Sequence, residues 1–165
     1  AEGLVYAGDL TAMMIDPESV RHDEMNSMLE CERVSEERAD EWAMTAWRGF
    51  GGGEEEVPES YREFVRALSV ESGRVRLYLA KKDGESVGVF GLTEEPGVMG
   101  VYYFAVVPEV RRQGIAREMM NEVCRLAGKK KVVLQSTPMG EKFYSNYGFR
   151  ELFKIPMYST SCDIF

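Results

Sequence analysis

The sequence predicts an α/β fold, and three stretches of the chain carry this prediction. Residues 75–92 alternate apolar and polar side chains around Asp83 and Gly84, a pattern typical of two antiparallel strands joined by a tight turn. Residues 101–107 are nearly all apolar or aromatic, which indicates a strand covered on both faces. Residues 115–126 repeat apolar side chains at helical spacing. Strands and helices therefore occur together in one stretch of chain.

The amino-terminal residues are the hardest to interpret. Residues 4–7 and 10–15 could pair as strands around Gly8 and Asp9, which form a turn-favouring dipeptide. Residues 1–33 otherwise show no clear pattern, so we treat them as a poorly placed extension.

Helical spacing dominates residues 34–70. Apolar side chains recur three and four positions apart up to Phe50, and Ser35 is placed to cap this helix. Ser60 and Glu63 form a capping-box pair ahead of a second, shorter helix. We expect two helices here.

The carboxy-terminal third predicts three more elements. Residues 132–134 fit a short buried strand, residues 140–147 a short helix and residues 149–158 a last strand. Pro156 lacks an N–H group, which favours an edge position for that strand. Because no repeat or linker interrupts the chain, we expect a single domain over residues 1–165.

Composition excludes several classes of protein. The chain has 165 residues, 44% of them hydrophobic, which is enough to bury a core. Cys31, Cys124 and Cys162 are scattered and His22 is the single histidine, so we expect no disulfide framework, no metal site and a reducing, cytoplasmic compartment. No apolar run approaches the ~20 residues of a membrane span, and no signal-peptide pattern opens the chain. We therefore expect no membrane partner.

The net charge of −8 bears on binding partners. Nucleic-acid-binding proteins gain most of their affinity from a basic face, so we expect no nucleic acid partner. A cationic substrate such as an amine is compatible with an acidic chain, although solubility alone also explains the charge.

The most informative segment joins the strand over residues 101–107 to the helix that follows. After Pro108 the turn reads Arg111, Arg112, Gln113, Gly114, Ile115 and Ala116. The first N–H groups of a helix lack partners within it and lie at the positive end of its dipole, so this turn can bind an anion. Gly114 lets a phosphate approach the backbone, and the small Ala116 leaves room for a pyrophosphate. The alternative is an ordinary connection with solvated arginines.

A second motif lies about thirty residues downstream. A short helix over residues 140–147 ends at Gly148, and Phe149 begins a strand. Tyr144 lies one helical turn before Tyr147. Taken alone it could be a core aromatic residue.

Together the two motifs resemble those of the GNAT superfamily of N-acetyltransferases. The acetyl-CoA-binding motif of that family reads Arg/Gln-x-x-Gly-x-Gly/Ala, and it is matched by Arg111, Gly114 and Ala116. The later motif, Tyr-x-x-x-Gly-Phe, is matched by Tyr144, Gly148 and Phe149.

The resemblance assigns roles to the two halves of the chain. It implies a mixed, mainly antiparallel sheet with helices on both faces, in which residues 75–158 bind acetyl-CoA and residues 34–70 lie on the acceptor side. Residues 1–33 have no clear place in it. The chain departs from the family at Thr137, where many members have asparagine, and at Gly140, where alanine is usual.

The resemblance also implies a mechanism. A bulge would leave backbone groups of Phe104, Ala105 and Val106 free to bind the pantetheine arm, with Thr137 nearby. The N–H group of Val106 would stabilise the developing oxyanion while a neutral amine attacks directly. Tyr144 would protonate the leaving thiolate. No carboxylate stands out as the general base.

Alternative functions remain open from the sequence. We expect acetyl transfer to a primary amine, on a small molecule, with acetyl-CoA as co-substrate and a homodimer as a possible assembly. The chain could instead be a non-catalytic acyl-CoA sensor, or an acetyltransferase for a protein lysine or N-terminus. A dinucleotide-binding enzyme is disfavoured because Gly-x-Gly-x-x-Gly is absent from the sequence and the strands before the turn are joined by a hairpin.

Overall fold

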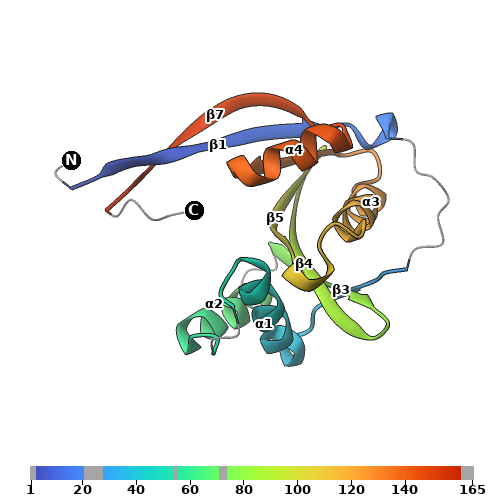
Figure 1. Ribbon diagram of the computed structural model, residues 1–165. Coiled ribbons are helices and arrows are strands. Elements are labelled where there is room, and N and C mark those ends of the chain that lie inside the picture. Colours follow the sequence, from blue (N-terminus) through green and yellow to red (C-terminus); the bar gives the residue numbers. More distant parts are fainter. Residues whose placement is uncertain (1–2, 21–27, 54–55, 71–73, 161–165) are drawn as a thin grey trace.

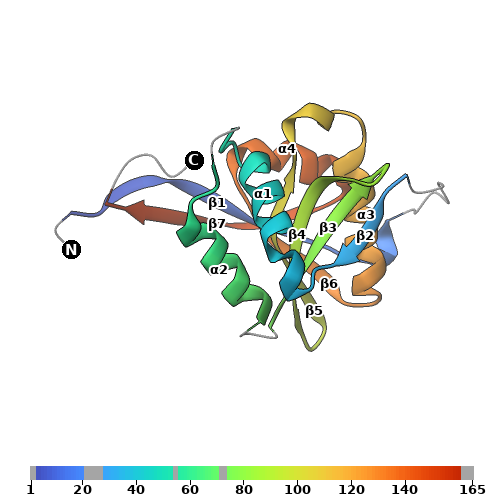
Figure 2. The ribbon, with the colours of Figure 1, turned by 90° about the horizontal axis from the view of Figure 1, so that it is seen from below.

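The computed structural model describes residues 3–20, 28–53, 56–70 and 74–160 of the chain. Its strands are β1 (Val5–Ile15), β2 (Glu30–Arg33), β3 (Val75–Lys82), β4 (Glu85–Glu95), β5 (Val98–Val106), β6 (Lys131–Ser136) and β7 (Arg150–Ser159). They form one sheet in the order β2-β3-β4-β5-β6-β1-β7 (Figures 1 and 2). All neighbours are antiparallel except β5 and β6. The mixed, mainly antiparallel sheet predicted from the sequence is confirmed.

Helices lie on both faces of this sheet, as expected. They are α1 (Ala39–Gly49), α2 (Glu59–Val70), α3 (Ile115–Ala127) and α4 (Pro138–Tyr147), with 3-10 turns at Pro17–Ser19, Glu36–Arg38 and Pro108–Val110. Helices α1 and α2 lie in front of the strands in Figure 2 and share one apolar core with β3, β4 and β5. Helices α3 and α4 pack on the opposite face, in a larger core that also takes residues from β6 and β1. No helix in the described part of the chain is long and apolar enough to cross a membrane.

The hairpin expected around Gly8 and Asp9 is wrong. Residues 5–15 form the single strand β1, which lies inside the sheet between β6 and β7. The register with β7 shifts between Tyr6 and Gly8, and Gly8 has a φ of 114°. A positive φ at glycine serves a bulge as well as a turn, so the dipeptide bends the strand without reversing it. Strands β1 and β7 extend beyond the other strands as a two-stranded ribbon (Figure 1).

Two helix starts also differ from the prediction. Ser35 precedes the 3-10 turn, makes no capping hydrogen bond through its side chain, and is followed by α1 only at Ala39. Helix α2 begins at Glu59, so Ser60 lies inside its first turn and cannot be the cap. Pro58 directly before the helix supplies a fixed φ in place of a capping side chain.

The two turn residues with the strongest sequence signals are placed as predicted. Asp83 and Gly84 join β3 to β4 with φ values of 52° and 83°, the combination that a tight hairpin turn needs. Pro156 lies on β7, which is an edge strand of the sheet, as predicted.

The described cysteines, Cys31 and Cys124, are free thiols. His22 and Cys162 lie outside the described residues.

Candidate active site

The site begins where two parallel strands part. Strands β5 and β6 pair only from Val98 opposite Lys131 to Val101 opposite Leu134, although β5 continues to Val106. Along the unpaired stretch β5 bulges against β4, because its register shifts and Tyr103 has a φ of 52°. A bulge twists its strand away from a neighbour. The sheet therefore has a gap on the β6 side of β5.

Backbone groups of β5 point into this gap. The N–H group of Val107 donates to the carbonyl oxygen of Val87 on β4 at 3.0 Å. Because successive residues of a strand direct their backbone groups to opposite sides, Phe104 and Val106 direct theirs toward β6. Ala105 is opposite Val89 of β4 and directs its backbone groups the other way. Two of the three predicted backbone residues therefore direct groups into the gap, where the carbonyl oxygen of Val106 accepts a hydrogen bond from Arg111, and Ala105 does not.

The turn after β5 leads into the start of α3. Arg112 and Gly114 have φ values of 64° and 86°, so the backbone curls twice through the left-handed region. The N–H groups of Arg117 and Glu118 both bond to the carbonyl oxygen of Gly114. Those of Ile115 and Ala116 precede the first helical hydrogen bonds. Together the curled backbone and the positive end of the helix dipole form a concave site for an anion.

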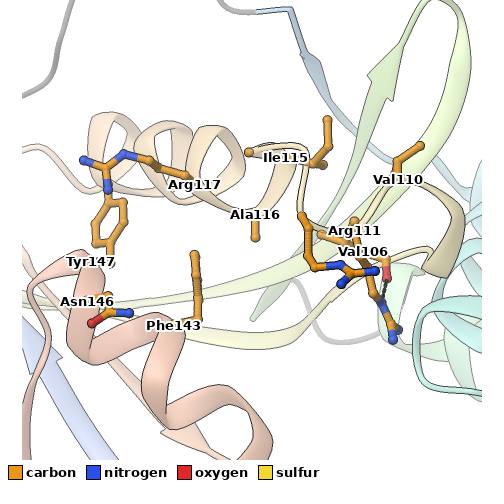
Figure 3. Close-up of a pocket in the computed structure, with 11 residues that line it drawn as sticks. Val106, Val110, Arg111, Ile115, Ala116, Arg117, Phe143, Asn146 and Tyr147 are labelled. Atoms are coloured by element: carbon orange, nitrogen blue, oxygen red, sulfur yellow. Dashed lines mark hydrogen bonds between the residues drawn. The ribbon is translucent and has the colours of Figure 1, made fainter.

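A cavity of about 370 Å³ opens directly at this turn (Figure 3). Its lining includes six of the predicted cofactor-binding residues, namely Val106, Arg111, Arg112, Gly114, Ile115 and Ala116. Phe104, Ala105, Gln113 and Thr137 are not among the lining residues. Gln113 instead contacts Lys82 and the carbonyl oxygen of Glu109.

Five further residues line the cavity and were not predicted from the sequence. They are Val110, Arg117, Phe143, Asn146 and Tyr147. Arg117 lies over the ring of Tyr147 at 5.6 Å, so a cation from α3 meets an aromatic wall from α4. Helical spacing could have identified all of them except Val110, because Asn146 and Tyr147 lie one turn after Phe143 and Arg117 lies one turn after Gly114. The cavity therefore has a cationic side from α3 and an aromatic side from α4.

Arg111 holds the turn against helix α1. Its Nε donates to the carbonyl oxygen of Val106 at 3.0 Å, and its second terminal nitrogen donates to that of Gly49 at 2.7 Å. Gly49 ends α1 and approaches β5 so closely that an added Cβ would lie 2.8 Å from the Cβ of Ala105. The guanidinium thus ties together the end of α1, the end of β5 and the turn. The Arg111 guanidinium contributes positive charge to the cavity, although two of its N–H groups already donate to backbone carbonyl oxygens.

Tyr144 lies behind the cavity rather than in its lining. The ring is buried and packs against Phe104 and Phe149, with ring centroids 6.1 Å and 5.5 Å away. Burial raises the pKa of the phenol well above its ordinary value of 10.0, so the group stays protonated at neutral pH. Gly140 lets this ring pack, because an added Cβ would lie 3.1 Å from it and 2.8 Å from Ser136 Oγ. An alanine at this position would thus require the Tyr144 ring and the Ser136 hydroxyl to shift.

Glu94 and Glu109, which lie near the ends of β4 and β5, are poorly suited to act as bases. A hydrogen bond and ion pair with Lys130 at 2.8 Å lowers the pKa of Glu94, and Arg76 adds to this effect. The backbone N–H of Glu109 and the side chain of Arg48 lower the pKa of Glu109. A lowered pKa makes a carboxylate a weaker proton acceptor. Within the described residues no cluster of three or more histidine, cysteine or acidic side chains could hold a metal ion.

Strands β5 and β6 thus part beside a helix start that can bind an anion. The family model described as an acetyltransferase (GNAT) domain matches residues 52–160. The chain therefore belongs to the GNAT acetyltransferase family. No curated protein matches its sequence.

Solved structures share the fold at low sequence identity. A conserved protein of unknown function from Staphylococcus epidermidis has a TM-score of 0.73 and 17% identity, covering 92% of this chain and 60% of that one. A GCN5-related N-acetyltransferase from Kribbella flavida has a TM-score of 0.64 and 16% identity, covering 94% and 59%. An aminoglycoside N-acetyltransferase in complex with CoA has a TM-score of 0.63 and 16% identity, covering 84% and 98%. The chain thus spans about three fifths of the length of the first two proteins.

Proposed function

We propose that this protein is an N-acetyltransferase that moves an acetyl group from acetyl-CoA to a primary amine of a small molecule. The observation that carries the proposal is the gap between β5 and β6, which leads directly to the curled turn at the start of α3. A long ligand with phosphates at one end and amide groups along its length fits such a site, because the phosphates would meet the first N–H groups of α3 and the amide groups would meet the edge of β5 that β6 leaves. The CoA complex of the aminoglycoside acetyltransferase with the same fold supports this assignment.

The phosphates would be held at the turn. The N–H groups of Gly114, Ile115 and Ala116 would face the phosphates at the helix start, with Arg112 and Arg117 at the rim of the cavity. We also propose Gln113 and Thr137 as cofactor contacts, on the sequence resemblance alone, because neither residue lines the cavity. The backbone edges of Phe104 and Val106 would bind the amide groups of the pantetheine arm. Ala105 would serve only as the residue that packs against α1.

The chemistry requires little more than positioning and two polar groups. The amine nitrogen bonds to the acetyl carbon, the bond from that carbon to sulfur breaks, and the amine proton is lost to water. The N–H group of Val106 would donate to the carbonyl oxygen as negative charge develops there. Tyr144 would donate its proton to the leaving sulfur and regain a proton from water, and burial keeps the phenol in its protonated form at neutral pH before the transfer. Neither a cysteine nucleophile nor a metal takes part in this scheme.

Acetyl-CoA binding and turnover can be tested separately. Acetyl-CoA at about 100 times its dissociation constant should stabilise the fold by ~2.7 kcal/mol, which for a chain of this size raises the Tm by about 5–10 °C. Release of free thiol with a panel of amines then measures transfer. An unchanged Tm at millimolar acetyl-CoA would refute the binding site. A raised Tm without thiol release for any amine would instead favour the sensor alternative.

Other parts of the proposal rest on the sequence alone. We propose a cytoplasmic location and a single domain over residues 1–165, with a homodimer as one possible assembly. A protein lysine or N-terminus is the alternative acceptor, and peptides in the same amine panel would identify it.

A further inference from the structure

A second hollow lies across the sheet from the cofactor cavity. It has a volume of about 240 Å³, and its floor is formed by β5, β6, β1 and β7. Tyr102 and Gln135, the first residues of β5 and β6 beyond their last pair, both line it. The hollow therefore begins where the two strands start to part, and it opens on the face that carries α1 and α2.

This face of the sheet is apolar and exposed. Phe153 and Leu152 of β7 are 59% and 41% exposed, and Tyr102 is 44% exposed. The Tyr102 ring packs over Gly100, since a Cβ added to Gly100 would lie 3.0 Å from a ring carbon of Tyr102. The full lining is Ala12, Met13, Val101, Tyr102, Val133, Leu134, Gln135, Leu152, Phe153 and Ile155. None of these residues is charged, and the only polar side-chain groups are the hydroxyl of Tyr102 and the amide of Gln135.

The position of the hollow relative to the gap indicates its occupant. A ligand held at its anionic end by the turn at Gly114, and extended along the free edge of Phe104 and Val106, has its other end directed toward Tyr102. That end is the acyl end in the proposed function. An amine that attacks from the opposite face would rest its body against the apolar floor.

Charge and size narrow the class of amine. A polycation such as spermidine or an aminoglycoside needs carboxylates, and this lining has none. A volume of 240 Å³ lies below the ~300–1,000 Å³ of pockets that hold drug-sized ligands, so it suits one ring or a short alkyl chain. We propose that the acceptor is a monoamine with an aromatic or alkyl body that packs against Tyr102, Val133 and Phe153. This inference rests on the proposed acetyltransferase function.

The first test compares amines by thiol release with acetyl-CoA as donor. We expect kcat/KM for phenethylamine to exceed that for spermidine or neamine by tenfold or more, because hydrophobic contacts of even one methylene discriminate by about 10–200-fold. Phe153→Ser should lower kcat/KM for phenethylamine by at least about tenfold while leaving methylamine little changed. Tyr158→Ser is the matched control, since Tyr158 lies on the same strand at 58% exposure and does not line the hollow.

A reciprocal variant tests the charge argument. Gln135→Glu adds one carboxylate at an exposed position of the lining without changing the side-chain size. It should improve kcat/KM for spermidine relative to phenethylamine by severalfold. A parent enzyme that prefers spermidine or neamine, or a Phe153→Ser variant with unchanged selectivity, would overturn the inference.

Binding without turnover separates this inference from the proposed function. Saturation-transfer NMR should detect phenethylamine bound to the parent protein and not to Phe153→Ser. Bound phenethylamine with no thiol release for any amine would refute the acetyltransferase function and leave the hollow as an amine site. A concentration-dependent dimer that Phe153→Ser dissociates, with selectivity unchanged, would show that a second copy covers this face and would overturn the proposal.

Discussion

Replacement of Gly114 by alanine separates the fold from the anion site at the start of α3. Gly114 has a φ of 86°, and an added Cβ would meet nothing within 4 Å. The methyl group therefore strains the backbone without a clash, at a cost of about 1–2 kcal/mol in the free energy of unfolding. Gly114 also lines the cavity, so the methyl group would crowd a phosphate that approaches the backbone there.

Gly97 provides a matched control for this variant. It has a φ of 78°, also with nothing within 4 Å, and it lies in the turn between β4 and β5, away from the cavity. Both alanine variants should lose similar stability in urea unfolding. Only Gly114→Ala should lose acetyl-CoA affinity. We expect a loss of roughly 10–100-fold, because a hydrogen bond to a charged group is worth about 1.5–3 kcal/mol.

The assay is the stabilisation that acetyl-CoA produces. At 100 times the dissociation constant of the parent, the stabilisation of ~2.7 kcal/mol should fall to about 1.4 kcal/mol for a tenfold loss of affinity and about 0.4 kcal/mol for a hundredfold loss. Gly97→Ala should retain the full value. Equal stabilisation of the two variants by acetyl-CoA would refute the assignment of phosphate binding to this turn.

Two further variants test the remaining parts of the site. Tyr144→Phe should lower kcat by about 100-fold and leave acetyl-CoA affinity unchanged. The control is Tyr78→Phe, which alters a buried tyrosine stacked on Phe90. If the Tyr144→Phe variant keeps activity within twofold of the parent, Tyr144 is a packing residue only. Because burial raises the pKa of Tyr144 above 10.0, its ionisation should not lower kcat of the parent below that pH. Arg111→Lys should cost about 1 kcal/mol of stability and weaken acetyl-CoA binding, because lysine cannot reach both carbonyl oxygens in a fork. Arg48→Lys, which alters an exposed ion pair with Glu109, should change neither, and equal effects of the two lysine variants would contradict the role of Arg111.

Local chemistry explains which features could be predicted from the sequence. Asp83 and Gly84 specify their hairpin by backbone preference, and the apolar side chains of α3 specify its buried face by spacing. The turn around Gly114 combines both signals, so its position was predictable to the residue. The lining residue Tyr147 was noted only for its place in a helix, because the contact with Arg117 joins two helices.

The features that could not be predicted from the sequence depend on residues that are far apart along the chain. Gly8 has the same intrinsic freedom in a turn and in a bulge, and only pairing with β7 decides between them. The second hollow draws residues from four strands, of which β1 had no assigned place. The outward direction of Gln113 is set by Lys82 and Glu109, whose approach no local pattern reveals.

The position of β1 has a consequence for how the chain folds during synthesis. Its partners in the sheet are β6 and β7. Ile15 therefore cannot pair until Val132 has been synthesised, and Val5 cannot pair until Ser159 has been synthesised. At about 5–20 residues per second, a ribosome needs roughly 6–30 seconds to produce these partners. Until then a strand with two unpaired edges and several apolar side chains is exposed to other nascent chains. Contacts of such long sequence separation also slow refolding in isolation.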